Sequence, residues 1–368
     1  MEPCAFMYLI CSVNKEEKLA MPTTLNLEVA VAAQKVVRDL CAVKVGESLL
    51  VTVDSAGSFQ IAEEIAKAGE VAGAKVMLAW HSTPNGVGKV GEKYLPDPLK
   101  AAIPETDVWI ELNNQWMGYS TPYENALVPP NRVRYLCLDG LDEERIVRLI
   151  GRVDLDAQEA FQDKVVELTQ RSQKMRITTP AGTNVSFEND PKRPVISELK
   201  CHTPGAHFML GQIAWAPIEK TINGEIVFDA SFYGGGRADL STLREPITFH
   251  VREGICIDIT GGDDANFVKG WMKSLNDQNM YHEAHICYGF NPGARPSGIC
   301  VEDERIWGAT EWGFGHQGIQ FKADGVPAVT HLDGICLDSS VWQDGSQVLD
   351  EGRVIHPELV GLASRLGK

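Results

Sequence analysis

The sequence predicts an α/β protein with two domains, an N-terminal α/β domain with a parallel sheet and a C-terminal β-rich metal-binding domain. Up to residue 174, short apolar runs alternate with amphipathic stretches of helical period, which is the pattern of strand–helix–strand units. Beyond that point, short strands separated by Gly, Asn and Asp turns predominate. A length of 368 residues is enough for two cores. We therefore expect domains over residues 21–174 and 175–368.

The period of the apolar residues gives the elements of the N-terminal domain. Thr23 or Thr24 can cap a long amphipathic helix whose last apolar position is Val43. Nearly continuous apolar runs further on are typical of strands buried on both faces, and stretches of helical period lie between them. The expected strands are 48–53, 75–80, 108–112 and 133–138, and the expected helices are 59–74, 142–150 and 156–173.

The C-terminal domain is expected to consist mainly of hairpins. One hairpin turns at Pro180–Asn184, and a single helix covers Asp264–Asn276. The other β-rich segments are 223–232, 244–262 and 334–352. The glycine-rich pieces 85–91 and 233–237 are predicted to be loops, because neither lies between a clear strand and a helix as a phosphate-binding loop does.

Composition and charge exclude several classes of function. The chain has 34 Lys and Arg against 50 Asp and Glu, a net charge of −16, and no local cluster of basic residues, so a nucleic acid is not expected as a partner. No apolar run is long enough to span a bilayer, and no membrane association is expected. Nine scattered cysteines without a CxxC pair indicate reduced thiols in a cytoplasm.

The first 20 residues are assigned no role. Cys4–Val13 is apolar, but it lacks the basic start of a signal peptide, and the residues after it are charged instead of small and cleavable. We interpret residues 1–20 as a non-native or mis-assigned extension, with Met21 opening the first domain.

The triplet His331-Leu332-Asp333 carries the clearest chemical signal. Residues two apart in an extended segment project to the same face, so His331 and Asp333 could bind one metal ion together. His285 lies among apolar residues, and Glu311 lies in an apolar, Gly-rich segment where an unpaired carboxylate is costly to bury. Two histidines with one or two carboxylates are ligands of non-haem Fe(II) or of Zn(II), and the spacing does not decide between these two metals.

Five segments of the C-terminal half resemble, in order and spacing, the family of aminopeptidase T/S-type metallopeptidases. They are most similar to its ring-cleaving branch, the 2,5-dihydroxypyridine 5,6-dioxygenases. The segments are 211–232, 261–277, 284–294, 303–315 and 330–338. The N-terminal half matches only in its α/β pattern. The resemblance implies this two-domain fold, a homo-oligomer, and a site in the cleft between the domains.

The resemblance also implies a single metal ion. Where the peptidases carry metal-binding carboxylates, this chain has Gln212 and His285, and a neutral amide is a poor ligand. His285, His331 and Asp333 then match the iron ligands of the dioxygenases. Glu311 has no counterpart in that branch, and it could be a fourth ligand or a general base.

Four further residues are expected at the substrate. His207 aligns with a histidine that faces the substrate in the dioxygenases and could take a proton from a bound hydroxyl, although it could also be an ordinary loop histidine. Tyr119 falls where the N-terminal domain offers a polar side chain to the ring, and Gln212 is expected to contact the substrate. Trp312 could stack on a planar ring, although the core is the usual place for tryptophan.

Three functions are consistent with these residues. The first is an Fe(II)-dependent dioxygenase that uses O₂ to open a hydroxylated N-heteroaromatic such as 2,5-dihydroxypyridine in aromatic catabolism, with His207 or Glu311 moving the proton. The second is a hydrolase of amides or lactams, with one Zn(II) or Mn(II) and Glu311 as the base. The third is a non-catalytic binder of small molecules. It is the weakest of the three because His285 and the His331–Asp333 pair are present.

Overall fold

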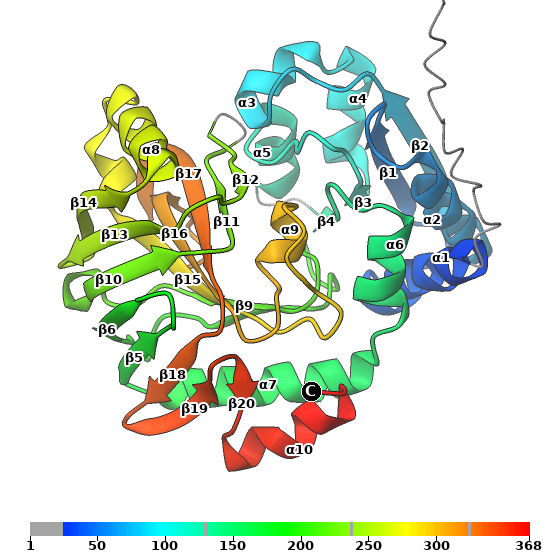
Figure 1. Cartoon of the computed structure of the whole chain (residues 1–368). Coiled ribbons are helices and arrows are strands. Elements are labelled where there is room, and N and C mark those ends of the chain that lie inside the picture. The colour runs from blue at the N-terminus through cyan, green and yellow to red at the C-terminus, as the bar shows by residue number, and fades with distance from the viewer. Residues whose placement is uncertain (1–24, 129–131, 236–237, 323–324) are drawn as a thin grey trace, which may run out of the picture.

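The computed structural model describes residues 25–128, 132–235, 238–322 and 325–368. The expectations for residues 1–20, for the cap at Thr23 or Thr24 and for Gly236 and Arg237 lie outside the described residues. Two lobes are joined by helices along one side (Figure 1), and the expected pairing of a parallel sheet with β-rich C-terminal sheets is confirmed.

The N-terminal lobe contains a parallel sheet of five strands in the order β2-β1-β3-β4-β8. Every residue of β3 and β4 is buried, as expected for strands covered on both faces. The strands are β1 Ser48–Asp54, β2 Lys75–His81, β3 Val108–Glu111, β4 Arg134–Cys137 and β8 Gly205–Phe208. Because β8 comes from beyond residue 174, the chain returns to this sheet after entering the second lobe. The proposed boundary at residue 174 stays a prediction.

Helices cover the parallel sheet in several short pieces. The helix expected to reach Val43 instead ends at Leu40, and its last part, Lys35–Leu40, is π-helical. The helix expected at 142–150 likewise begins as an α-helix and ends as a π-helix. The helices are α1 Leu25–Gln34, η1 Lys35–Leu40, α2 Phe59–Val71, α3 Gly88–Gly91, η2 Glu92–Tyr94, α4 Asp97–Ala102, η3 Ile103–Glu105, α5 Thr121–Leu127, α6 Glu143–Ile146 and η4 Val147–Gly151. The glycine-rich piece at 85–91 was expected to be a loop, but its second half forms the short helix α3, while residues 85–87 are irregular.

The C-terminal lobe packs two sheets against each other. Their strand orders are β14-β13-β10-β6-β5-β18-β19-β20 and β12-β11-β17-β16-β15-β9-β7. The strands are β5 Lys174–Thr178, β6 Asn184–Glu188, β7 Ile196–Glu198, β9 Gln212–Trp215, β10 Asn223–Phe228, β11 Ser231–Tyr233, β12 Ser241–Thr242, β13 Ile247–Arg252, β14 Ile255–Gly261, β15 Glu283–Gly289, β16 Thr310–Gln317, β17 Val326–Cys336, β18 Ser340–Gln343, β19 Ser346–Asp350 and β20 Arg353–Val354. The expected hairpin around Pro180–Asn184 is the antiparallel pair β5–β6. One aromatic-rich core, with Phe249 and Trp312 among its members, fills the space between the sheets.

Two helices of this lobe matter for the site. Helix α7, Leu155–Arg171, links the lobes, and the Asp154 side chain caps it by accepting from the Ala157 N–H at 2.9 Å. Helix α9, Cys300–Asp303, lies between the lobes (Figure 1). The buried Glu302 of α9 accepts from Arg145 Nε at 3.1 Å and ties α9 to the N-terminal lobe. The remaining helices are η5 Glu219–Thr221, α8 Asp263–Ser274, η6 Gln278–Tyr281 and α10 Pro357–Arg365.

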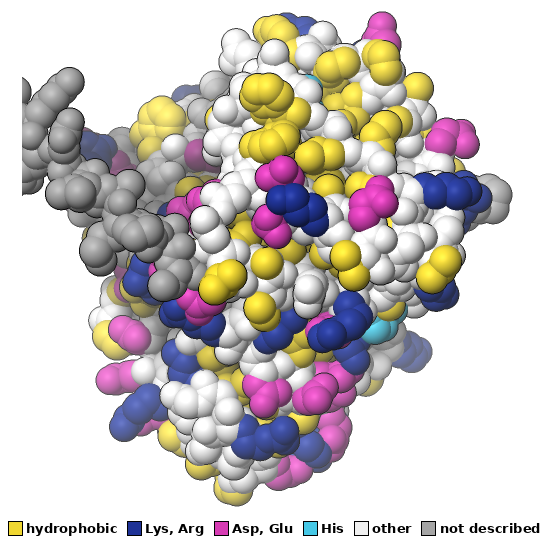
Figure 2. Space-filling model, turned by 90° about the vertical axis from the view of Figure 1, so that its right-hand side faces the viewer, with side chains coloured by type: hydrophobic (Ala, Val, Ile, Leu, Met, Phe, Trp, Pro, Cys, Tyr) yellow, Lys and Arg dark blue, Asp and Glu magenta, His cyan; other side chains and the backbone are white. Residues whose placement is uncertain are grey.

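The outer face of the N-terminal lobe carries mixed charges and several hydrophobic side chains (Figure 2). Met77 and Trp80 on the end strand β2 are 44% and 65% exposed. Among the described residues, no helix is both long and apolar enough to cross a membrane. The seven described cysteines are all free, and every one except Cys300 is buried.

Candidate metal centre

One face of the seven-stranded sheet carries the candidate metal ligands, and its other face lies in the core. Along β15, His285 and Cys287 alternate with the core residues Ile286 and Tyr288, as the two-residue period of a strand requires. The register places His285 opposite Gly313 of β16, and Gly313 opposite Asp333 of β17. Side chains from two strands therefore meet above a glycine on the strand between them.

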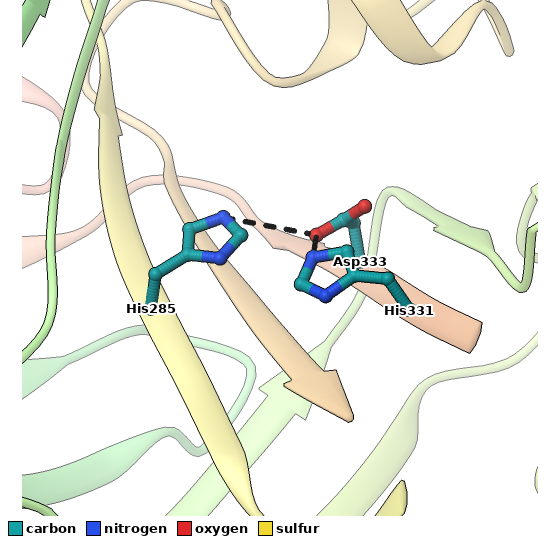
Figure 3. A group of neighbouring side chains, drawn as sticks. All are labelled: His285, His331 and Asp333. Atoms are coloured by element: carbon teal, nitrogen blue, oxygen red, sulfur yellow. Dashed lines mark hydrogen bonds and ion pairs between the residues drawn. The ribbon is translucent and has the colours of Figure 1, made fainter. Parts of the chain in front are cut away.

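His285, His331 and Asp333 converge in that space (Figure 3). Each offers one ligand atom, and the three atoms lie within 4.8 Å of one another. Asp333 Oδ1 is 2.8 Å from His331 Nε2 and 3.9 Å from His285 Nε2. The two imidazole rings are parallel, with centroids 4.9 Å apart and 6° between their planes. The expected convergence of these three side chains is thus present in the fold.

Gly313 leaves the room that the two rings occupy. A Cβ at this position would lie 2.5 Å from His285 Cε1 and 2.8 Å from His331 Cε1. Real Cβ atoms do not approach other heavy atoms so closely, and both neighbours are ring atoms whose movement would misplace the ligand nitrogens. Glycine is therefore required here for close approach and not for an unusual backbone angle.

Neighbouring groups fix both rings. His331 Nδ1 lies 2.8 Å from the carbonyl oxygen of His316, so it carries a proton and donates it, while Nε2 faces Asp333. This is the usual way in which proteins orient a metal-binding histidine. Phe321 stacks on the other face of His285, with ring centroids 4.9 Å apart and 10° between the planes.

Glu311 lies beside this group and is almost fully buried. Its Oε1 is 3.0 Å from His285 Nε2, yet the two are not aligned for a hydrogen bond, and both Oε1 and His285 Nδ1 lack a hydrogen-bond partner among the described residues. Its Oε2 accepts from Gln212 Nε2 at 3.0 Å. Gln212 is held in this orientation because its Oε1 accepts from the buried Arg305 at 3.0 Å. Buried lone pairs without a donor are what a bound cation would satisfy.

The surroundings favour a neutral His285 and a protonated His331. Burial lowers the pKa of His285 to about 4, with the neighbouring His331 adding to the effect. Burial also opposes the charged form of His331, but the Asp333 carboxylate outweighs it and raises the pKa of His331 to about 9. Burial, together with Glu311, raises the pKa of Asp333. A metal ion would find His285 neutral and would have to displace a proton from His331.

The residues present fit a mononuclear site for a divalent cation. Two imidazoles and one carboxylate suit Fe(II) or Zn(II) and leave coordination positions open. A second group, Cys300, Glu304 and Asp333, also has its ligand atoms within 4.8 Å of one another, but Cys300 Sγ donates to Glu304 at 3.0 Å.

Tyr119 approaches the centre from the N-terminal lobe. Its ring makes an edge-on contact with His316, with centroids 5.6 Å apart. The residue is 39% exposed, yet burial of its hydroxyl raises its pKa to about 12, and the charges of Asp333 and Glu304 contribute. Its backbone is left-handed, with φ of 61°, which is uncommon for an aromatic residue.

Among the described residues, no hydrogen bond, ion pair or ring contact joins His207 or Trp312 to the three ligands. His207 lies in β8, where its Nε2 faces the Thr203 carbonyl oxygen at 2.8 Å. Within the described residues, no hydrogen bond or ion pair joins His207 to His285, His331 or Asp333. Trp312 is fully buried in the core, because it lies on the opposite face of β16 from Glu311 and Gly313. The proposed role of His207 remains a prediction.

Sequence reasoning did not single out four residues that organise the site. Glu304 and Arg305 flank Gln212, while His316 and Phe321 hold the two imidazoles. The charged run that contains Glu304 and Arg305 and is followed by Ile306 and Trp307 was the available signal for the first pair. Phe321 gave none, because its place depends on the path of the chain between β16 and β17.

Comparison with known proteins gives the family. The chain matches the family described as NicX, 2,5-dihydroxypyridine 5,6-dioxygenase, over residues 30–356. A 2,5-dihydroxypyridine 5,6-dioxygenase of Pseudomonas putida (strain KT2440) is 25% identical over 191 residues. This alignment covers 49% of the chain and 49% of the relative, so the chain spans about half the length of the curated relative that it matches.

Two solved structures share the fold. The 2,5-dihydroxypyridine dioxygenase from Pseudomonas putida KT2440 superposes with a TM-score of 0.72 at 18% identity, covering 91% of this chain and 99% of that one. AmpT from Thermus thermophilus superposes with a TM-score of 0.62 at 12% identity, covering 90% of this chain and 100% of that one. The expected resemblance is confirmed, and since the family match covers most of the sequence, the chain belongs to the 2,5-dihydroxypyridine 5,6-dioxygenase family.

Proposed function

We propose that this protein is an Fe(II)-dependent dioxygenase that opens the ring of a hydroxylated N-heteroaromatic such as 2,5-dihydroxypyridine. The observation that carries the proposal is the group His285, His331 and Asp333 above Gly313, in a chain of this family. Bound Fe(II) would supply the redox chemistry that allows a spin-paired aromatic ring to react with O₂. The curated relative's name supports the substrate class.

The chain's own residues would bind the metal, orient the ring and move a proton. His285, His331 and Asp333 would hold the metal. Glu311 would accept the proton of a substrate hydroxyl through Oε1, because Oε2 is engaged with Gln212. Burial, together with the nearby Glu304, raises the pKa of Glu311, and a raised pKa suits a group that takes up a proton near neutral pH.

Three residues predicted to act on the substrate have different support. Tyr119 would face the ring, because its ring contacts His316 beside the ligands. Gln212 would act indirectly, because both ends of its amide are already bonded to protein groups. His207 would need a change of its hydrogen bond with Thr203 before it could take a proton.

The second candidate function is hydrolysis of an amide or lactam with Zn(II) or Mn(II). The position of Glu311 favours it, because a carboxylate beside a single metal ion is the usual base for activating water. In that reaction O₂ would not be consumed. The two candidates therefore differ in a co-substrate that can be measured directly.

The first experiment is metal analysis of anaerobically purified protein, followed by O₂ uptake with 2,5-dihydroxypyridine. About one Fe(II) per chain with substrate-dependent O₂ uptake would support the dioxygenase. Zn(II) or Mn(II) without O₂ uptake would favour the hydrolase, and the next substrates would be amides and lactams. A protein that binds none of these metals would be a non-catalytic binder.

We also propose that the protein acts in the cytoplasm, in aromatic catabolism, as a homo-oligomer. The resemblance supports these assignments, and sedimentation of the purified full chain would test the last of them.

A further inference from the structure

Two buried carboxylates at the edge of the parallel sheet have no part in the metal centre. Asp54 ends β1 and Glu111 ends β3, and both side chains are fully buried. The two strands are parallel neighbours, so both acids lie at the carboxyl edge of the sheet. In open α/β sheets this is the edge at which ligands bind. Here, however, the carboxylate oxygens are occupied by groups of the protein itself.

Asp54 accepts four backbone N–H groups. Its Oδ1 binds Ala56 and Gly57, each at 2.9 Å, and so closes the turn that follows β1. Its Oδ2 binds Asn114 at 3.0 Å and Gln115 at 2.9 Å. Half of its hydrogen-bonding capacity is therefore directed at a segment that begins 60 residues further along the chain.

Glu111 binds the next part of the same segment. Its Oε1 accepts from the Met117 N–H at 2.7 Å and from Asn113 Nδ2 at 2.9 Å. Its Oε2 accepts from the Tyr135 hydroxyl at 2.6 Å. Trp116 Nε1 donates to that hydroxyl at 2.8 Å, so the tyrosine proton is directed to Glu111. All of these partners of Glu111 are donors.

The segment held in this way is residues 113–120, which contains neither a helix nor a strand. Next to its end lies Tyr119, whose left-handed backbone costs free energy and persists only where the surroundings impose it. Trp116 packs on Tyr119, with ring centroids 5.1 Å apart. Tyr119 in turn contacts His316, whose carbonyl oxygen fixes His331.

We propose that Asp54 and Glu111 are positioning residues that hold segment 113–120 in the shape that presents Tyr119 to the metal centre. The part of this inference that concerns substrate rests on the proposed function, in which Tyr119 faces the ring. Without the two acids, three loop N–H groups would lose their buried acceptors, and water or a new loop path would have to replace them. The acids thus hold an irregular loop in one fixed conformation.

The variant Glu111→Gln tests the tether. It keeps the size of the side chain but replaces one acceptor oxygen with an NH₂ group that faces donors. Asp264→Asn is the matched control, because Asp264 is also a buried carboxylate, lies on α8 in the other lobe, and pairs with Arg244. Backbone amide exchange of segment 113–120 is measured in the metal-free full chain, so this arm depends on neither metal nor substrate.

We expect exchange in segment 113–120 to be about tenfold faster in Glu111→Gln, with the rest of the parallel sheet unchanged, and no change in that segment in Asp264→Asn. Unchanged exchange in Glu111→Gln would overturn the tether. If Glu111→Gln unfolds, Asp54→Asn is used in the same way, because its remaining oxygen can still close the turn at Ala56 and Gly57.

The second arm separates positioning from simple stability. With iron content equal to that of the wild type, Glu111→Gln should raise KM for 2,5-dihydroxypyridine by roughly tenfold, because a misplaced contact weakens orientation of the ring. Faster exchange with unchanged KM and kcat would show a purely structural role and overturn the proposal. If the wild type consumes no O₂, the proposed function fails, and amide exchange alone still decides the tether.

Discussion

The two lobes supply the site in different ways. In the C-terminal lobe the ligands stand on β15 and β17 themselves, where strand register fixes which side chains meet. In the N-terminal lobe the sheet offers no side chain directly to the centre among the contacts described above, and an irregular segment carries Tyr119 instead. A site built on strands is held to within fractions of an ångström, whereas a site on a loop needs added restraints. Asp54 and Glu111, at the ends of β1 and β3, supply the added restraints that the segment carrying Tyr119 needs.

The largest effect is expected from removing a ligand on the strands. His331→Ala should lose Fe(II) and activity together, with binding weakened by more than about 100-fold, because one of three protein ligands and the partner of Asp333 disappear. Metal content after anaerobic loading measures this. His207→Ala is the matched histidine control and should retain its metal. Full metal content in His331→Ala would show that the ligand assignment is wrong.

A smaller effect, on turnover alone, is expected from Glu311→Gln. The amide oxygen can still accept from Gln212 Nε2 in place of Oε2, but the NH₂ group in place of Oε1 cannot take up a proton. We expect kcat to fall by about 100-fold with metal retained. Steady-state O₂ uptake and metal analysis of the same sample check this. Loss of metal would identify Glu311 as a fourth ligand. If kcat fell by about 100-fold in His207→Ala and not in Glu311→Gln, His207 would be the residue that accepts the substrate proton.

Gly313→Ala probes the spacing that the strand register creates. The added methyl group must push on both imidazoles, so we expect metal affinity to fall by about tenfold. Gly270→Ala is the control, because nothing lies within 4 Å of a Cβ at that helical position, and it should be slightly stabilising. Isothermal titration with Zn(II) measures both variants. Unchanged affinity in Gly313→Ala would mean that the rings have more freedom than the packing indicates.

The same contrast decides how much could be predicted from the sequence. Alternation along one strand predicted that His331 and Asp333 share a face, because that information is local. His285 lies on another strand, and its place in the ligand set came from the resemblance to the family. The sequence did not exclude Trp312 from the site, since its core position depends on which face of β16 packs into the core and which face carries the metal centre. Asp54 and Glu111 were not singled out, because their partners are backbone N–H groups of a distant segment, and backbone groups carry no sequence signature.

The smallest effect concerns stability and pH in the metal-free protein. His331 has its pKa raised to about 9 from an ordinary 6.5. The native state therefore binds more protons than the unfolded state between these values. Its contribution to the unfolding free energy is complete below pH 6.5 and is lost as pH rises through about 9, by at most about 3 kcal/mol.

Burial also raises the pKa of Glu111, although its hydrogen-bond donors oppose that shift, so the parallel sheet adds a pH dependence of the unfolding free energy with the same sign. The difference between the wild type and His331→Gln therefore isolates the metal centre from the parallel sheet. Urea unfolding of both proteins from pH 6 to 9.5 measures it, and a difference that does not change with pH would contradict the His331–Asp333 pairing. Added Zn(II) should remove the loss in the wild type, because a bound cation takes the place of the His331 proton and binds more tightly as that proton leaves.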